Sequence, residues 1–158
     1  MDSNPLFSDQ TFLSKYLNIS QLAIGSFGSV YSAISKETSE KVAIKVELKD
    51  PKNTTLFDEA RFLYELKEEP NFPKISYFST NEKYSYVIME LLGKNLETLK
   101  EESLSKLLPI NTVLLIADQA LTRLQKLHEK GIIHRDLKPE NFLIGLASRK
   151  DTLFLIDY

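Results

Sequence analysis

The segment with the most chemistry in this sequence is His134-Arg-Asp-Leu-Lys-Pro-Glu-Asn141. Within it, Asp136 could accept a proton and Lys138 could neutralise a phosphate oxygen. Asn141, together with Asp157 near the end of the chain, could bind a hard divalent cation through oxygen atoms. The alternative is a solvated polar loop, but a fixed H-R-D-x-K-P-x-N pattern arises by chance only about once in a million starting positions.

Two further features could bind a phosphate. The segment Gly25-Ser-Phe-Gly28 lies between two predicted strands, and glycines there let backbone N–H groups approach an anion; a plain hairpin turn is the alternative. Lys45 lies in the middle of the apolar strand 42–46, so it either extends to solvent or pairs with a buried acid or an anion. Glu59, 14 residues further on, is a candidate partner, although it could also lie on a solvated helix face.

The elements that must position these residues follow from hydrophobic periodicity and turn signals. Strands are expected at residues 17–24, 29–35, 41–48, 75–80 and 84–90, with a helix at 55–68 after the third strand. Helices are then expected at 96–101 and from Asn111, as N-cap, to a stop at Gly131. A short apolar segment at 142–144 and an apolar run at 153–156 complete the chain. Strands and helices segregate, which predicts an α+β fold with two lobes.

Composition excludes several classes of protein. The 158 residues carry 20 Lys and Arg against 22 Asp and Glu, a net charge of −2, which argues against a dedicated nucleic-acid binder. The chain has no cysteine, so a disulfide framework and a thiolate zinc site are ruled out. No apolar run is long enough for a membrane span, and the N-terminus lacks the pattern of a signal peptide. We therefore expect an intracellular location, in the cytoplasm or nucleus.

The order of these motifs resembles that of the eukaryotic protein kinases. A glycine-rich loop joins the first two strands, a lysine lies on the third, a glutamate lies on the next helix, and the H-R-D segment follows a long helix. The chain is similar to the casein kinase I group of serine/threonine kinases in the motifs Gly25-Ser-Phe-Gly28, Leu91-Leu-Gly93, Ala117-Asp-Gln119, Asn141-Phe-Leu-Ile-Gly145 and Ile156-Asp-Tyr158. The resemblance extends from about residue 17 to the last residue.

The resemblance implies a protein-kinase-like two-lobe fold. Residues 1–16 would be an N-terminal extension, and 17–92 a complete small lobe with a five-stranded antiparallel sheet and one helix. Residues 93–158 would begin a helical large lobe, truncated after the metal-binding aspartate. We therefore expect the 158-residue chain alone to have little or no kinase activity and to expose apolar side chains of the helix at 113–127.

The resemblance also implies a role for each matching residue. The catalytic residues would be Asp136, which orients the substrate hydroxyl and accepts its proton, Lys138, Lys45 and Glu59. Asn141 and Asp157 would hold Mg²⁺. ATP would be bound by Leu22, Ala23, Gly25, Ser26, Phe27, Gly28, Val30, Ala43, Lys45, Met89, Glu90, Leu92, Leu143 and Ile156.

Two residues depart from the kinase pattern. Ala23 stands where G-x-G-x-x-G has its first glycine, and Tyr158 stands in place of Phe in D-F-G. The sequence thus predicts a serine/threonine protein kinase that uses ATP and Mg²⁺ and acts on proteins with acidic or phosphate-primed Ser/Thr sites. The alternative is a catalytically inactive module that binds a nucleotide or another protein. The sequence predicts no oligomeric state.

Overall fold

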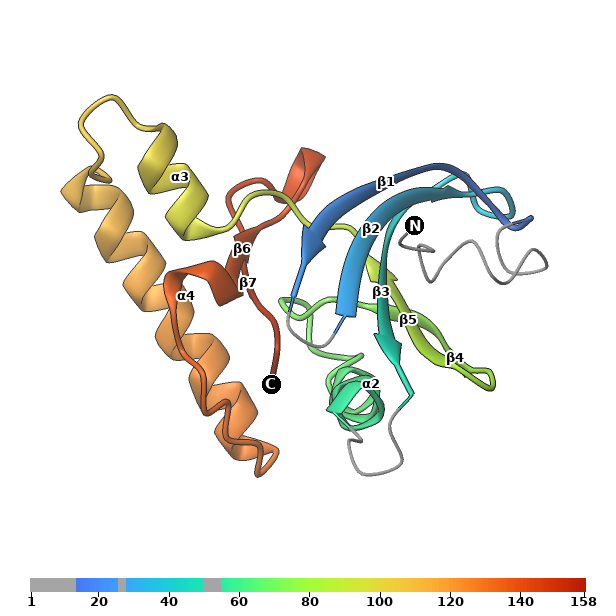
Figure 1. The fold of residues 1–158 in the computed structure, drawn as a ribbon. Helices are drawn as coiled ribbons and strands as arrows, with labels where there is room; N and C mark the ends of the chain where they lie inside the picture. Colours follow the sequence, from blue (N-terminus) through green and yellow to red (C-terminus); the bar gives the residue numbers. More distant parts are fainter. Residues whose placement is uncertain (1–13, 26–27, 50–54) are drawn as a thin grey trace. The chain divides into compact units, whose positions relative to one another are not determined.

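The computed structural model describes residues 14–25, 28–49 and 55–158. The chain forms two compact units (Figure 1). The first contains the described residues up to Tyr64 together with Lys74–Leu91, and the second contains Glu65–Pro73 together with Leu92–Tyr158. Each unit carries part of the predicted site.

The first unit is built on a five-stranded antiparallel sheet, as the sequence predicts. Its strands lie in the order β1-β2-β3-β5-β4. Their bounds are β1 (Tyr16–Ile24), β2 (Gly28–Ser35), β3 (Lys41–Leu48), β4 (Ile75–Thr80) and β5 (Tyr84–Glu90). The last three match the predicted ranges, whereas β1 and β2 each begin one residue earlier. The prediction of an α+β fold is confirmed.

Alternation along β3 divides the two faces of the sheet. Val42, Ile44 and Val46 point to one face, where they are almost fully buried. They form a core with Tyr31, Ala33, Tyr86 and Ile88. Burial of each large aliphatic side chain contributes about 1.5–3 kcal/mol to stability. The intervening residues, including Lys45, therefore lie on the other face of β3.

Helix α2 (Thr55–Glu65) is shorter than the predicted helix at 55–68. Leu56, Ala60 and Leu63 are buried at helical spacing, which explains why this segment is helical. The helix ends three residues early because the Glu69 N–H donates to the Leu66 carbonyl in a turn. Leu66, which lies in this turn, is 1% exposed, so its side chain is buried although the helix does not continue through it.

The second unit contains helices α3 (Leu96–Glu102) and α4 (Ile110–Glu129). Asn95 caps α3, because its Oδ1 accepts from the Thr98 N–H at 2.8 Å. The prediction of Asn111 as N-cap of the long helix is wrong. Pro109 takes that position, since its carbonyl already accepts from the Val113 N–H at 3.0 Å. Gly131 follows α4 with φ +73°, which confirms it as the stop.

A small hairpin completes the second unit. Strands β6 (Phe142–Ile144) and β7 (Leu153–Leu155) pair antiparallel. Short 3-10 turns, η2 (Pro139–Asn141) and η3 (Ala147–Arg149), lie before β6 and between the strands. All three residues of β7 are at most 2% exposed. The predicted final strand is thus a buried strand that leads directly to Asp157.

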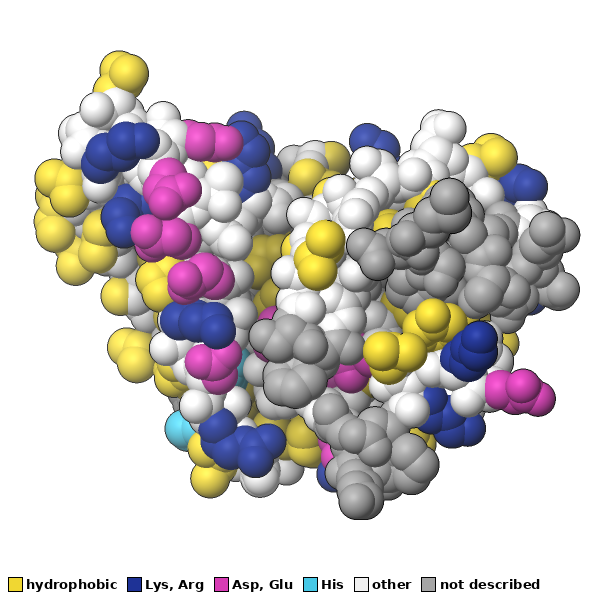
Figure 2. Space-filling view, viewed as in Figure 1, with side chains coloured by type: hydrophobic (Ala, Val, Ile, Leu, Met, Phe, Trp, Pro, Cys, Tyr) yellow, Lys and Arg dark blue, Asp and Glu magenta, His cyan; other side chains and the backbone are white. Residues whose placement is uncertain are grey.

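Helix α4 leaves an apolar face exposed, as expected. Its inner side buries Arg123 and Leu127. Its outer side exposes Ile110, Val113, Leu114, Leu115 and Leu121, and yellow side chains follow the helix in Figure 2. None of the helices within the described ranges combines the length and apolarity that crossing a bilayer requires.

Candidate active site

Lys45 and Glu59 form an ion pair in the first unit. The Lys45 Nζ donates to the Glu59 Oε2 at 2.6 Å, and the two side chains are 18% and 6% exposed. Strand alternation turns Lys45 away from the apolar core, while helical spacing turns Glu59 toward the buried side of α2. The structure therefore favours the pairing of Lys45 with Glu59. It does not place the lysine in solvent or the glutamate on a solvated helix face. The pair presents an oriented cation, which is suited to a phosphate oxygen.

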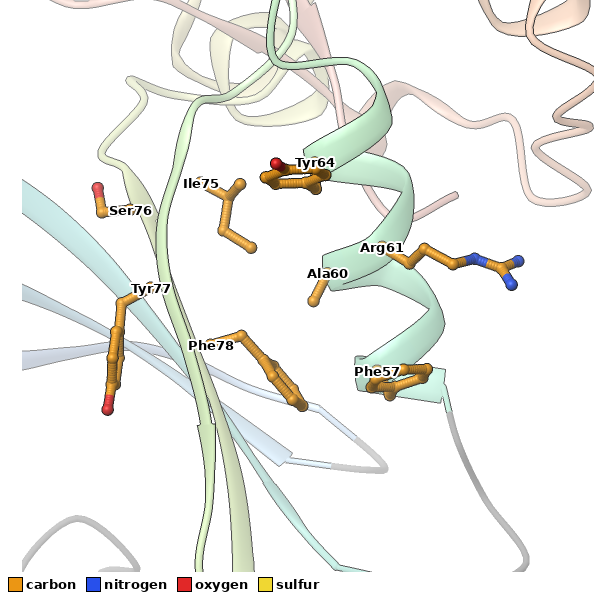
Figure 3. A pocket seen from close by; sticks show the side chains of 8 residues that line it. All are labelled: Phe57, Ala60, Arg61, Tyr64, Ile75, Ser76, Tyr77 and Phe78. Atoms are coloured by element: carbon orange, nitrogen blue, oxygen red, sulfur yellow. The ribbon is translucent and has the colours of Figure 1, made fainter.

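On another side of α2, aromatic side chains of the helix and of β4 line an open groove. The rings of Phe57 and Phe78 meet edge to face with centroids 5.7 Å apart. They line a groove of about 410 Å³ together with Ala60, Arg61, Tyr64, Ile75, Ser76 and Tyr77. In Figure 3, Phe57, Tyr64, Ile75 and Phe78 project into the space between helix and strand, while Arg61 points away from it. On this side, α2 faces β4 through aromatic side chains.

Strand register gathers several predicted nucleotide-binding residues on one face of the sheet. Ala23 lies opposite Val30, and Val30 lies opposite Lys45. On the other side of β3, Ala43 lies opposite Met89. Opposed residues of antiparallel strands share a face, and Ala43 and Lys45 share one by alternation. Val30 and Ala43, which are expected to contact adenine, therefore lie on the same face as Lys45, which is expected to contact phosphate.

The remaining predicted residues of the first unit lie at strand ends or irregularities. Leu22 lies where the β1–β2 register shifts, and Glu90 is the last residue of β5. The Gly25 N–H donates to the Gly28 carbonyl at 2.8 Å. Ser26 and Phe27, also predicted to cover the phosphates, lie outside the described residues.

The two glycines of this loop differ in whether their surroundings leave space for a side chain. A Cβ on Gly28 would overlap the carbonyl oxygen of Val46 on the neighbouring strand. A Cβ on Gly25 would lie 3.7 Å from its nearest neighbour, an ordinary contact. Gly28 is therefore required by the sheet, whereas none of the described residues around position 25 requires a glycine there.

In the second unit, Asp136, Lys138 and Asn141 form one hydrogen-bonded cluster. The Asp136 Oδ2 accepts from the Lys138 Nζ at 2.6 Å and from the Asn141 Nδ2 at 3.3 Å. The Asn141 Nδ2 also donates to the Asp136 carbonyl at 2.9 Å. The hydrogen bond from Lys138 lowers the pKa of Asp136 below its ordinary value of 3.8, and the same bond raises the pKa of Lys138. Asp136 is therefore ionised at neutral pH.

His134 and Asn141 tie this loop to the residues that follow β7. The His134 Nε2–H donates to the Ile156 carbonyl at 2.8 Å, and its Nδ1 accepts from the Asp136 N–H at 3.3 Å. The Ile156 N–H in turn donates to the Asn141 carbonyl at 3.1 Å. His134 is only 3% exposed, so these bonds are shielded from water. They hold Ile156 against this loop. Asp157 is the next residue in the chain, and its charge contributes to the raised pKa of Lys138.

Two residues without a predicted role anchor β7 to α4. The Arg123 Nε donates to the Leu153 carbonyl at 2.9 Å, and the Gln119 Oε1 accepts from the Leu153 N–H at 2.8 Å. Arg123 also donates to the Gln119 Oε1 at 3.0 Å. Burial lowers the pKa of the Arg123 guanidinium. The i,i+4 spacing of these residues was the available signal, but it does not reveal that a distant strand edge is their partner.

The last predicted nucleotide-binding residues, Leu92, Leu143 and Ile156, also belong to the second unit. The Gly93 N–H donates to the Ile144 carbonyl at 2.7 Å, and Asn95 forms a β-bridge with Leu143. The segment after Leu92 therefore runs along β6. A Cβ on Gly93 would lie 3.0 Å from that Ile144 oxygen, which explains the glycine.

Asn141 and Asp157 offer oxygen ligands of the kind that Mg²⁺ prefers. Because the Asn141 amide nitrogen donates to Asp136, its Oδ1 is the atom suited to a cation. Within residues 14–25, 28–49 and 55–158, no three His, Cys, Asp or Glu side chains are grouped to hold a metal. Mg²⁺ is commonly held by one or two protein oxygens, with phosphates and water completing its shell. The side chains therefore fit a magnesium ion that arrives with a nucleotide.

Comparison with known protein families identifies one matching family model, described as protein kinase domain. The match covers residues 16–158. This range contains both units of the structure from β1 onward and every residue of the candidate site.

Proposed function

Because the chain belongs to the protein kinase domain family, we propose that it is a serine/threonine kinase of the casein kinase I type. It would transfer the γ-phosphoryl group of ATP to Ser or Thr hydroxyls of proteins. The observation that carries this proposal is the hydrogen-bonded cluster of Asp136, Lys138 and Asn141. The cluster retains every group that phosphoryl transfer requires from this loop.

The first unit supplies the proposed contacts to the phosphates and to adenine. The Lys45 ammonium, kept in place by Glu59 at 2.6 Å, contacts the α- and β-phosphates. Ala43, on the face of Lys45, contacts the adenine ring, and Met89, which lies opposite Ala43, guards the back of the pocket. In the second unit, the Asn141 amide oxygen and the Asp157 carboxylate would hold Mg²⁺, which would neutralise phosphate charge.

In the transfer step, a Ser or Thr hydroxyl oxygen forms a bond to the γ-phosphorus while the bond from that phosphorus to the β,γ-bridging oxygen breaks, and ADP leaves. Asp136 orients the hydroxyl and takes its proton. General-base help of this kind contributes about 10²–10⁴-fold. The lowered pKa of Asp136 makes it a weak base, so orientation is the larger part of its role. Lys138, 2.6 Å from Asp136, neutralises a γ-phosphate oxygen.

The substrate class rests on the resemblance to the casein kinase I group. A lysine two residues after the catalytic aspartate is typical of kinases that act on Ser and Thr. The structure pairs this lysine directly with Asp136, which supports a role for Lys138 at the reacting phosphate. We expect substrates with acidic or already phosphorylated residues near the target hydroxyl.

The test is ATP-dependent phosphorylation of an acidic Ser peptide by the full-length protein, with a matched Tyr peptide as comparison. We expect transfer to the Ser peptide and loss of at least about 10²-fold in rate for Asp136→Asn. Undiminished transfer by Asp136→Asn would refute the assignment. Preferential transfer to the Tyr peptide would refute the serine/threonine class but not the kinase.

A catalytically inactive nucleotide-binding module is the second candidate. It is favoured by Ala23, which replaces the first glycine of the phosphate-binding loop. A ligand at 100 times its Kd stabilises a protein by about 2.7 kcal/mol, so Mg-ATP should raise the melting temperature in either case. Stabilisation by Mg-ATP without any phosphate transfer by the full-length protein would select this second candidate.

A further inference from the structure

The turn after β7 holds Asp157 in an unusual backbone conformation. Asp157 has φ +60°, in the left-handed region that residues with a Cβ seldom adopt. Aspartate tolerates this region better than most residues, but such a conformation persists only where its surroundings hold it. Asp157 is also the residue whose carboxylate is proposed to bind Mg²⁺, so what holds the turn also sets the direction of the metal ligand.

Hydrogen bonds hold the turn on both sides of Asp157. On the N-terminal side, the Ile156 N–H donates to the Asn141 carbonyl, and the Ile156 carbonyl accepts from the His134 Nε2–H. On the C-terminal side, the Tyr158 hydroxyl donates to the Leu155 carbonyl at 2.6 Å. This bond connects the residue after Asp157 to the last residue of β7, and so closes a loop around Ile156 and Asp157.

The ring of Tyr158 is fixed by its neighbours. Its centroid lies 5.9 Å from that of His134, in an edge-to-face contact, and 6.0 Å from that of Phe72. Tyr158 is 9% exposed, and its hydroxyl bond is buried. A phenylalanine could make the same ring contacts but could not donate to the Leu155 carbonyl. The tyrosine therefore adds one hydrogen bond, from its hydroxyl to the Leu155 carbonyl, to the turn that contains Asp157.

We propose that Tyr158 is a positioning residue for Asp157, and that its hydroxyl bond to the Leu155 carbonyl keeps the Asp157 carboxylate oriented for the metal. This inference rests on the proposed function, in which Asp157 binds the nucleotide-associated cation. The proposal gives the Tyr158 hydroxyl, which donates to the Leu155 carbonyl, no contact with the nucleotide. Its effect is confined to how strongly a divalent cation improves ATP binding.

The test compares ATP affinity with and without Mn²⁺, used as the probe cation, by calorimetry on the whole chain. The variants are Tyr158→Phe and Asp157→Asn. A matched control is Tyr86→Phe, because Tyr86 is 1% exposed and its hydroxyl accepts from the Asn81 Nδ2 at 2.9 Å, in the first unit. Both Tyr→Phe changes remove one buried hydroxyl and keep the ring. A purely structural role for the Tyr158 hydroxyl would make the two variants behave alike.

We expect Tyr158→Phe to leave Mn²⁺-free ATP affinity within about twofold of wild type and to reduce the Mn²⁺ enhancement about fivefold, the effect of one lost hydrogen bond. Tyr86→Phe should keep the full enhancement, and Asp157→Asn should abolish it. The paramagnetic resonance signal of free Mn²⁺ gives a second readout, since weaker binding raises that signal.

The outcomes separate the two proposals. Full enhancement in Tyr158→Phe, with none in Asp157→Asn, would overturn the positioning role and leave the metal role of Asp157 intact. An equal loss in Tyr158→Phe and Tyr86→Phe would also overturn it. If Asp157→Asn kept the enhancement, or wild type had none, the metal site itself would be wrong and the inference would fall with it.

Discussion

The Lys45 ammonium and the Glu59 carboxylate lie 2.6 Å apart, joining the middle of β3 to the second turn of α2. Both side chains are largely buried, so removing one partner leaves a charge in a poorly solvated place. The same helix faces an open groove beside β4. This ion pair therefore links α2 to β3, and it also orients the Lys45 ammonium.

Replacement of Glu59 by alanine should destabilise the protein by about 2–3 kcal/mol, because it leaves the Lys45 ammonium without its partner. The free energy of unfolding in urea measures this. The control is Glu102→Ala, which breaks an ion pair of the same 2.6 Å length with Lys94, where both side chains are more than half exposed. That change should cost under about 1 kcal/mol. Equal losses would show that burial of the Lys45–Glu59 pair has no energetic consequence.

The two glycines of the β1–β2 loop should respond differently to alanine. Gly28→Ala forces the new methyl against the Val46 carbonyl and should cost about 1–3 kcal/mol or more of stability. Gly25→Ala makes only ordinary contacts, so it should keep the fold while weakening Mg-ATP binding if its backbone approaches phosphate. Thermal melts with and without Mg-ATP separate the two effects. A Gly25→Ala protein with wild-type ATP affinity would contradict the phosphate role of that position.

The ionisation of Asp136 should follow its bond to Lys138. Since the pKa of Asp136 is lowered, the bond is fully present above its ordinary value of 3.8 and is lost as the pH falls through the lowered value. Replacement of Lys138 by methionine should raise the pKa of Asp136 back toward that value. Carbon-13 NMR of the carboxyl group against pH measures both. As the control, Glu140→Gln should move this titration far less, because no hydrogen bond from Glu140 affects Asp136. Titration of wild-type Asp136 above pH 5 would contradict this prediction.

Arg123 should be more important for stability than its place on a helix indicates. Arg123→Met leaves the Leu153 carbonyl without a charged donor and should cost about 1.5–3 kcal/mol. Hydrogen exchange should also accelerate at the β7 amides, because Arg123 and Gln119 bind both polar groups of Leu153. Lys126→Met, one turn away in an exposed pair with Glu129, should change stability by less than about 0.5 kcal/mol. Unchanged β7 exchange in Arg123→Met would contradict the anchoring role.

Much of the fold could be predicted from local patterns. Period-two alternation predicted strands 41–48, 75–80 and 84–90 with their observed bounds, because side-chain direction in a strand depends only on neighbouring residues. Gly131 was predicted as the stop of α4 since a positive φ favours glycine at a helix end. The H-R-D-x-K-P-x-N spacing likewise predicted that Asp136, Lys138 and Asn141 act together, and the three are close in sequence.

The predictions of helix ends were wrong where several neighbouring residues could have ended or begun the helix. Asn111 is a good N-cap by type, but the Pro109 carbonyl accepts the first hydrogen bond of α4. The helix at 55–68 has the right periodicity, but the chain turns after Glu65, and Leu66 is buried in that turn. Hydrophobic periodicity cannot distinguish these outcomes, because the deciding energy comes from the atoms that surround the residue in three dimensions.

By itself, the sequence determined the strands, the helices and the set of reactive residues, because these depend on short-range sterics and on residue type. Only the tertiary structure decided how those residues are held. It pairs Lys45 with Glu59, binds Leu153 to Arg123 and Gln119 across about 30 residues of chain, and closes the Asp157 turn with the Tyr158 hydroxyl. The strength of such contacts depends on burial and on exact hydrogen-bond geometry, and the packing of the whole chain sets both.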